Sequence, residues 1–131
     1  MSTDSSSDGL SAIIDDMVNA YNEKDFERLR GFLAPQFYFC HHNRNFEHND
    51  ADDFIETLKT FASNLVPDRK LSEPESVIES GNTVVRTHTW GGLATTDIPG
   101  IGADGELIEI QLCSIYVYEG NLVTEYRDYG E

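Results

Sequence analysis

The chain has 131 residues, which is the length of one domain with a single core. Its 24 acidic and 9 basic residues give a formal net charge of −15, which repels nucleic-acid backbones and anionic lipid surfaces. The sequence contains no apolar run of roughly 18 to 20 residues, as a membrane span requires, and no basic and then apolar leader at its N-terminus. We therefore expect a cytoplasmic protein with no nucleic-acid partner and no membrane partner.

The N-terminal region is predicted to pass from a tail into a helix. Residues 1–8 are rich in Ser and Asp and have no periodicity, so we expect a disordered tail followed by one domain over residues 9–131. Apolar side chains then recur at the spacing of one helix face, at Leu10, Ile13, Ile14, Met17, Val18 and Tyr21. The last of them would carry an aromatic hydroxyl group toward the interior.

Two further helices are predicted from their caps and apolar stripes. Asp25 caps the second, which ends at Pro35 and faces inward with Phe26, Leu29, Phe32 and Leu33. Asp50 caps the third, which Pro67 terminates and whose buried stripe is Phe54, Ile55, Leu58, Phe61, Ala62 and Leu65. The first half of the chain is therefore predominantly helical.

The second half is predicted to be a sheet. A short aromatic strand is expected over residues 37–41, and a polar loop over residues 43–49. From residue 71 the apolar period is close to two, which predicts strands over residues 72–80, 83–94, 107–118 and 122–129. Gly-Asn pairs supply the tight turns at residues 81–82 and 120–121. Three N-terminal helices packed on the concave face of a curved, mainly antiparallel sheet make an α+β fold.

This order of elements resembles the nuclear-transport-factor-2-like superfamily, whose members are cone-shaped α+β rolls with a pocket between sheet and helices. Residues 21–35, which read YNEKDFERLRGFLAP, look most like the helix turn of scytalone dehydratase. The whole pattern is also similar to the SnoaL-like polyketide cyclases and to the ketosteroid isomerases. Because the superfamily includes dehydratases, isomerases, cyclases, epoxide hydrolases and non-catalytic binders, the resemblance implies a pocket rather than one reaction.

The resemblance to scytalone dehydratase also implies pocket positions. The first pocket tyrosine of that family falls on Tyr21, and its acidic neighbour falls on Asn22, which does not ionise. The second tyrosine falls on His41. The histidine on the long central strand falls on His88, and the second histidine falls on Gln111. These five residues are therefore candidates for catalysis or for substrate binding.

His88 and Tyr21 are the first two candidates for chemical roles. His88 lies in the middle of a predicted strand, where an imidazole that titrates near neutral pH could act as a general base or acid. The alternative is a hydrogen-bonded histidine of the sheet. Tyr21 could donate a hydrogen bond to a substrate carbonyl, or it could be a core tyrosine bonded to a backbone carbonyl.

His41 and Asp128 are the other two candidates for catalysis. His41 and His42 are adjacent in a strand and point to opposite faces, and His41 shares its face with Phe39. Asp128, in the segment EYRDYG, resembles the late aspartate that SnoaL-like cyclases use as a base. Its alternative is a solvated carboxylate at the end of a strand.

The remaining candidates are binding residues. Phe39 and Trp90 would give the pocket an aromatic lining that suits a small apolar or aromatic molecule, and Asn22 and Gln111 could orient it. Arg44, at the mouth, could bind a carboxylate or form a surface ion pair. The cluster CHHNRNFEH over residues 40–48 lacks the ligand spacing of a zinc site, so no metal and no cofactor are expected.

The preferred function is an enzyme that performs cofactor-free acid-base chemistry beside a carbonyl group, of the dehydratase, isomerase or cyclase type. Two alternatives on the same fold are a non-catalytic ligand-binding domain and a structural dimer module. A homodimer through the outer face of the sheet is expected, because we place an apolar row of the strand over residues 107–118 on that face: Ile108, Ile110, Leu112 and Tyr116.

Overall fold

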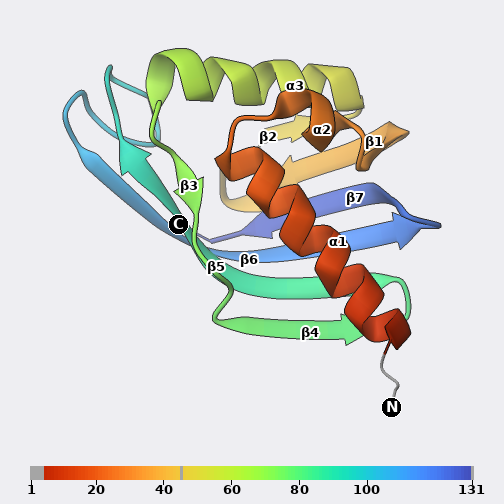
Figure 1. Ribbon diagram of the computed structural model, residues 1–131. Coiled ribbons are helices and arrows are strands. Elements are labelled where there is room, and N and C mark those ends of the chain that lie inside the picture. The colour runs from red at the N-terminus through yellow and green to blue at the C-terminus, as the bar shows by residue number, and fades with distance from the viewer. Residues whose placement is uncertain (1–4, 45, 131) are drawn as a thin grey trace.

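The computed structural model describes residues 5–44 and 46–130. Three α-helices, α1 (Ser5–Asn22), α2 (Phe26–Arg30) and α3 (Ala51–Thr60), lie on one face of a curved sheet (Figure 1). A turn of π-helix, η2 (Phe61–Leu65), continues α3. The expected α+β architecture with helices on the concave face is confirmed. Within the described residues, no helix is both long and apolar enough to cross a membrane.

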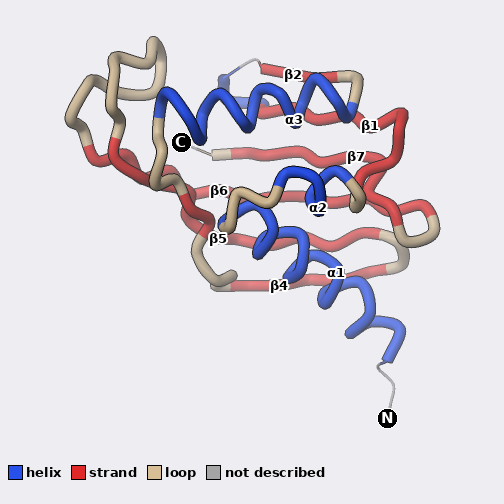
Figure 2. The backbone as a smooth tube through the Cα atoms, turned by 45° about the horizontal axis from the view of Figure 1, so that its top comes forward, coloured by secondary structure: helices blue, strands red, loops and turns tan. Residues whose placement is uncertain are grey.

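The sheet has seven strands, which run side by side beneath the helices in Figure 2. Their order is β2-β1-β7-β6-β5-β3, and β4 also pairs with β5. The pairing of β1 with β7 is parallel and the other pairings are antiparallel. The strands are β1 (Leu33–His41), β2 (Phe46–His48), β3 (Lys70–Leu71), β4 (Ser76–Ser80), β5 (Thr83–Leu93), β6 (Leu107–Glu119) and β7 (Leu122–Tyr129).

The helices form where the sequence supplies a cap and an apolar face. Asp50 accepts hydrogen bonds from the backbone N–H groups of Asp52 and Asp53, so the first turn of α3 has its free donors satisfied. On α1, Ile14 and Met17 are buried against the sheet. This burial fixes which side of each helix faces the strands.

Glycines close the two tight hairpins of the sheet. Ser80 pairs with Thr83 across one turn, and Gly81 in that turn has φ 60°. Gly120, with φ 65°, takes the same place between β6 and β7. A left-handed backbone of this kind favours glycine, which explains how the Gly-Asn pairs set the register of the long strands.

Three predicted boundaries need correction. Residues 5–8, expected in the tail, belong to α1, because Ser and Asp are compatible with the first turn of a helix; residues 1–4 lie outside the described part of the chain. The second helix ends at Arg30, and β1 begins at Leu33. Pro35 therefore lies in β1, at the register shift between Leu33 and Tyr38, where a missing N–H is tolerated.

The loop expected over residues 43–49 contains β2, which pairs antiparallel with β1. The apolar row of β6 is also corrected: its four residues, expected on the outer face, are all buried on the concave side, beneath the helices. Glu109 and Gln111, which alternate with this row, are exposed on the other face. The alternation of β6 was therefore predicted correctly, but the two faces of the strand were assigned the wrong way round.

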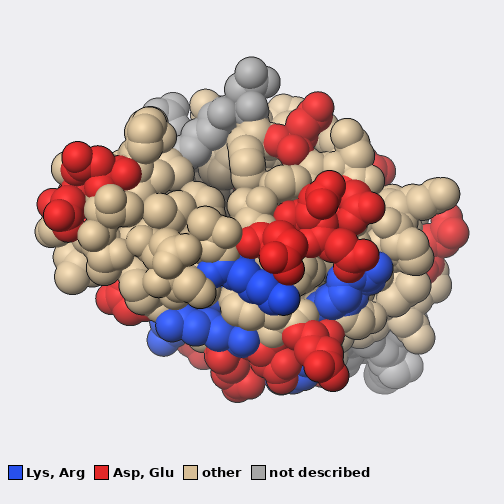
Figure 3. All heavy atoms as spheres, turned by 90° about the horizontal axis from the view of Figure 1, so that it is seen from above, with Lys and Arg blue, Asp and Glu red and all other residues tan. Residues whose placement is uncertain are grey.

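Charges on the helical side of the molecule are mixed. Figure 3, which looks down on the helices, shows acidic and basic side chains next to one another. Arg30 on α2 pairs with Asp52 on α3 at 2.8 Å, and Arg28 lies 3.5 Å from Glu23. The acidic excess is therefore dispersed on this face, with basic groups set among the carboxylates, and does not form one continuous patch.

Candidate active site

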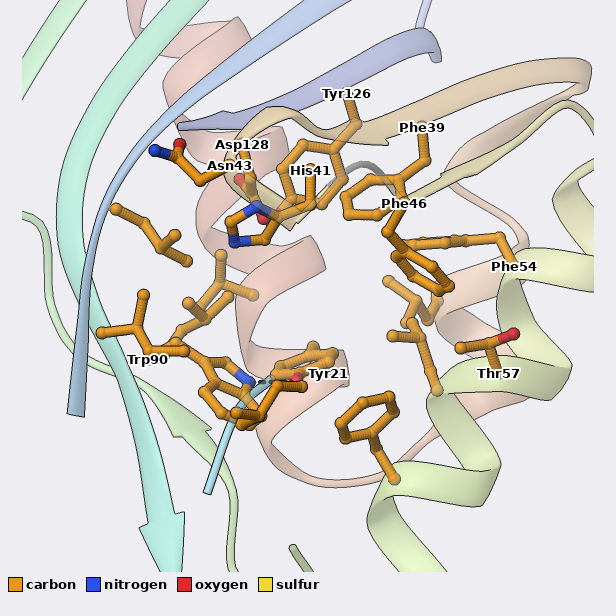
Figure 4. A pocket seen from close by; sticks show the side chains of 18 of the residues that line it. Tyr21, Phe39, His41, Asn43, Phe46, Phe54, Thr57, Trp90, Tyr126 and Asp128 are labelled. Carbon is orange, nitrogen blue, oxygen red and sulfur yellow. Dashed lines mark hydrogen bonds between the residues drawn. The ribbon is translucent and has the colours of Figure 1, made fainter. Parts of the chain in front are cut away.

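A cavity of about 540 Å³ lies between the helices and the concave face of the sheet. This volume is typical of sites for small organic molecules. Most of the lining is aliphatic or aromatic, and the aromatic residues include Phe39, Phe46, Phe54, Phe61 and Trp90. A few polar side chains are set into this apolar wall, and Figure 4 shows how they are arranged.

Asp128 and His41 form the polar side of the cavity. They are direct neighbours on the parallel strands β7 and β1, and both line the pocket (Figure 4). The Asp128 side chain is almost fully buried, and its Oδ1 accepts a hydrogen bond of 2.5 Å from the hydroxyl of Ser114 on β6. Burial raises the pKa of Asp128 to about 7, although the hydrogen bond from Ser114 opposes this shift. The carboxyl group is therefore poised to take or give a proton near neutral pH.

Tyr21 and Trp90 form the second polar element, from α1 and β5. The indole Nε1–H of Trp90 donates to the Tyr21 hydroxyl oxygen over 2.6 Å. Burial raises the pKa of Tyr21, so the phenol stays protonated at neutral pH. Because the oxygen already accepts from Trp90, its own hydrogen is directed elsewhere, and Tyr21 lines the pocket. The arrangement leaves a phenol donor for a ligand.

The buried cation Arg69 contacts both the ring and the backbone of Tyr21. The guanidinium of Arg69 lies 4.2 Å from the centre of the Tyr21 ring and donates a hydrogen bond of 2.6 Å to the Tyr21 backbone carbonyl. Arg69 is only 2% exposed. Its charge lowers the pKa of Tyr21, against the larger effect of burial. The phenol is therefore held in place by contacts on two sides.

His88 lies beneath the cavity wall instead of in it. Its side chain is fully buried, it is not among the pocket-lining residues, and its Nε2 lies 2.8 Å from the Ser114 hydroxyl. Burial, with a smaller effect of Arg86, lowers the pKa of His88 to about 4, so the ring is neutral at physiological pH. His88 is therefore separated from the cavity, which changes the role that its sequence position suggested.

A family model for the SnoaL-like domain matches residues 14–126, which is most of the chain. This chain belongs to the SnoaL-like family. The superfamily expected from the sequence is thereby confirmed, and no match was found among curated proteins.

Solved structures with a similar fold are numerous and distant in sequence. A candidate polyketide cyclase from Xanthomonas campestris pv. campestris has a TM-score of 0.79 and 16% identity, covering 93% of this chain and 90% of that one. TsrD from Streptomyces laurentii has a TM-score of 0.77 and 22% identity, covering 99% of this chain and 92% of its own. IdmH, a candidate polyketide cyclase from Streptomyces antibioticus, has a TM-score of 0.77, 15% identity and coverage of 93% and 91%. At these identities the likeness shows the SnoaL-like fold alone.

The structure places five of the nine candidate site residues of this SnoaL-like domain in the cavity. These are Tyr21, Phe39, His41, Trp90 and Asp128. Their chemical roles remain predictions, but their common location is what an acid-base site on this fold requires. The aromatic lining expected from Phe39 and Trp90 is present.

The other candidate binding residues lie elsewhere. Asn22 donates to the Leu71 carbonyl over 2.9 Å and accepts from the Leu71 N–H over 2.8 Å, so its amide joins α1 to β3. Gln111 is exposed on the outer face of β6, because the inward positions of that strand are the apolar ones. The side chain of Arg44 lies outside the described part of the structure.

Sequence reasoning missed Ser114, and it placed Asn43 at the mouth of the pocket without a role. Ser114 is fully buried between His88 and Asp128, and it was detectable as the hydroxyl residue in the apolar half of the β6 alternation. Asn43 lines the pocket, and its Oδ1 accepts from the Gly130 N–H over 2.6 Å. That bond joins segments 87 residues apart, and no local pattern reports such a contact.

The histidines of residues 40–48 are directed to separate places. His41 lines the pocket, His42 stacks on Tyr129 with ring centres 4.3 Å apart, and His48 lies 3.0 Å from the Thr57 hydroxyl. Within residues 5–44 and 46–130, no group of three or more His, Cys, Asp or Glu side chains could hold a metal ion. The expectation of a site without metal or cofactor stays a prediction.

Proposed function

We propose that this SnoaL-like protein is an enzyme that performs acid-base chemistry, without a cofactor, at a carbon next to a carbonyl group. The observation that carries the proposal is the buried carboxyl of Asp128, with a pKa of about 7, in the same cavity as the protonated phenol of Tyr21. A general base works best when its pKa lies near the working pH. A neutral hydrogen-bond donor works best where negative charge develops on oxygen.

The reaction begins with proton transfer. The Asp128 carboxylate takes a proton from the carbon beside the carbonyl, and the electrons of that C–H bond move onto the carbonyl oxygen to give an enolate. Tyr21 donates a hydrogen bond to this oxygen. The proton on Asp128 then returns to the product: to another carbon in an isomerisation, to the alkoxide formed by carbon–carbon ring closure, or to a leaving hydroxyl in a dehydration. None of these three reactions changes the oxidation state of the substrate overall.

The substrate is proposed to be a small apolar or aromatic ketone that places its reacting end between β7 and α1. In Figure 4, His41 and Asp128 lie at one side of the cavity, while Phe54 and Thr57 lie across it on α3. The apolar body would contact Phe54 and Phe61, and His41 would assist Asp128 as its neighbour. The candidate polyketide cyclases among the similar structures support this substrate class.

The cellular setting is part of the same proposal. We place the protein in the cytoplasm, as a homodimer. Cys40 and Cys113 are free thiols, a state that the reducing cytoplasm maintains. The dimer is argued with its test in the Discussion.

Proton exchange tests the reaction without knowledge of the natural substrate. 1-Tetralone, a neutral two-ring aromatic ketone, is incubated with the protein in D2O, and loss of the signal from the hydrogens beside its carbonyl is followed by NMR. We expect exchange catalysed by the wild-type protein, and Asp128→Asn to lower it by roughly 100-fold or more while 1-tetralone still binds. Exchange that Asp128→Asn does not slow would rule out Asp128 as the base.

A non-catalytic binding domain is the second candidate. Most of the side chains that line the cavity are apolar, so they can bind a ligand but cannot transfer a proton. The same experiment separates the two functions. If 1-tetralone and a panel of related neutral aromatic ketones bind and none exchanges, the binding domain is favoured. If exchange occurs and depends on Asp128, the enzyme is favoured.

A further inference from the structure

Four polar residues form a row across the concave face of the sheet: His88 on β5, Ser114 on β6, Asp128 on β7 and His41 on β1. Ser114 is the direct cross-strand neighbour of Asp128, and Asp128 is the direct neighbour of His41. His88 pairs with Leu112, so it lies diagonally from Ser114, within the reach of a long side chain. We call His88, Ser114 and Asp128 the buried triad.

When Asp128 is ionised, hydrogen-bond valence fixes the direction of both bonds in the buried triad. The serine hydroxyl has one hydrogen, and Ser114 Oγ donates it to Asp128 Oδ1 over 2.5 Å. The Ser114 oxygen is then an acceptor for His88 Nε2, which lies 2.8 Å away and must carry the ring hydrogen. The opposite ring nitrogen, Nδ1, is buried and makes no hydrogen bond within the described residues. The neutral Nε2–H form of His88 is therefore the form that this geometry selects.

The buried triad has one member that reaches the cavity. His88 and Ser114 are both fully buried and neither lines the pocket, whereas Asp128 does. Ser114 donates to Asp128 Oδ1, so Oδ2 is the oxygen that this serine leaves for proton exchange with a ligand. Tyr126, on the same strand, also acts on the carboxyl group through a hydrogen bond that lowers its pKa. A carboxylate held in this way offers a ligand one defined basic oxygen.

We propose that His88 and Ser114 are positioning residues, which hold Oδ1 of Asp128 as a hydrogen-bond acceptor so that Oδ2 takes and returns the substrate proton. The role in the reaction rests on the proposed function of Asp128 as the base. The bonds of the buried triad exist whether or not the protein is an enzyme. His88 contributes its Nε2–H, which polarises the Ser114 hydroxyl, and it does not touch the substrate.

Several other side chains lie near Asp128 and influence its pKa. His41 faces it from β1, Tyr116 from β6 and Tyr126 from its own strand. Tyr21 on α1 also interacts with its charge, and Arg86 on β5 lies beside Ser114 in the sheet. Substitutions of His88 leave all of these groups and their contacts in place, so a difference between the His88 variants reports the bond from His88 to Ser114. Ser114→Ala also removes the hydrogen-bond interaction of Ser114 with Tyr116, and the shift in that variant includes this effect.

The test is the pKa of Asp128, measured from its side-chain carbon signal by NMR on protein labelled with ¹³C at aspartate. Ser114→Ala removes the donor to Oδ1 with almost no change in shape, and we expect the pKa of Asp128 to rise by about one unit or more. His88→Met fills the same space without a donor and should raise it by a smaller amount. His88→Gln keeps an N–H near the Nε2 position and should stay close to wild type. Ser72→Ala, a serine that accepts from the Thr89 N–H instead, is the control and should shift nothing.

The outcomes are distinct. An unchanged pKa in Ser114→Ala would overturn the proposal, and so would equal shifts in His88→Met and His88→Gln, since His88 would then act by packing alone. With the expected shifts, the pH midpoint of 1-tetralone exchange should move upward in Ser114→Ala by the same amount as the carboxyl pKa. Expected pKa shifts without exchange in any variant would remove the proposed reaction and the role of Oδ2 in it, and would leave the buried triad as a hydrogen-bonded unit.

Discussion

The indole N–H of Trp90 donates to the hydroxyl oxygen of Tyr21, 69 residues away in sequence, over 2.6 Å. The bond sets the direction in which Tyr21 can donate, because an oxygen that accepts from one side presents its hydrogen to another. A donor whose own oxygen accepts a hydrogen bond is also more strongly polarised. Trp90 is therefore part of the apolar lining and also tunes the phenol.

Trp90→Phe is expected to slow the 1-tetralone exchange by about tenfold, because it removes the indole donor and keeps an aromatic ring against Phe61. Tyr21→Phe removes the donor to the substrate oxygen and should cost about 100-fold. NMR exchange rates, with 1-tetralone affinity measured alongside, check both values. If Trp90→Phe exchanges 1-tetralone as fast as the wild-type protein, the hydrogen bond from Trp90 does not affect the donor strength of Tyr21, and Trp90 contributes only packing.

The elements of the fold could be predicted because apolar periodicity is a local property. The stripes of α1 and α3 and the alternation of β5 and β6 are written in consecutive residues, and the Gly-Asn turns fixed where the long strands reverse. The direction in which β6 faces could not be obtained in the same way. The prediction that Gln111 lines the pocket assigned the wrong face of β6 to the interior. The helices, which are distant in sequence, decide which face of β6 is buried.

The site was only partly predictable, because its assembly also depends on contacts between residues that are distant in sequence. Tyr21 was chosen from a helical apolar stripe, His41 from strand parity and Asp128 from its place in the segment EYRDYG, each with family resemblance, and the structure brings them to one cavity. His88 was chosen because it lies in the middle of a predicted strand and matches the strand histidine of scytalone dehydratase. Its burial depends on Ser114 and on the neighbouring strands, which are distant in sequence.

Asn22→Asp tests the structural role of Asn22, the position where the resemblance to scytalone dehydratase implied an acidic residue. The Asn22 amide nitrogen donates to the Leu71 carbonyl, and a carboxylate there would face that oxygen with no hydrogen to share. We expect a loss of about 1 to 3 kcal/mol in the free energy of unfolding, measured with denaturant at neutral pH. Asn19→Asp, the same change at an exposed position one turn earlier on α1, is the control and should cost little. Equal losses in the two variants would contradict the role given to Asn22.

Asp128→Asn should change how stability depends on pH. Burial raises the pKa of Asp128 from 3.8 to about 7, so between these values the folded state binds more protons than the unfolded state. This contribution to stability is fully present below about pH 4 and is lost as the pH rises through about 7. Relative to wild type, Asp128→Asn should gain stability over this window, by at most about 4 kcal/mol above pH 8.

Comparing the two proteins at each pH isolates Asp128. The pKa of His88 is lowered to about 4, so His88 alone would make stability rise with pH between its folded and unfolded pKa values. Since both proteins contain His88, its effect cancels in the difference between their unfolding free energies. A difference that stays constant from pH 4 to 8 would mean that the carboxyl is ionised throughout.

The outer face of the sheet carries the last prediction, a homodimer. The helices cover one face only, as Figures 1 and 2 show, and the opposite face has an apolar row in register across three strands: Ile78, Val85 and Ile115. Ile78 is 63% exposed. Burying such a row against a second copy removes apolar surface from water on both chains.

Ile115→Glu places a charge at the β6 end of this row and is expected to give a monomer by light scattering, whereas we expect a dimer for the wild-type protein. Val77→Glu is the matched control, because Val77 is also exposed, at 46%, but pairs with the inward-facing Arg86 on the other side of the same edge. It should leave the dimer intact. A wild-type monomer at micromolar concentration would show that the outer face is not a dimer interface, and equal dissociation by both variants would place the interface at the edge strand β4 instead of on the face.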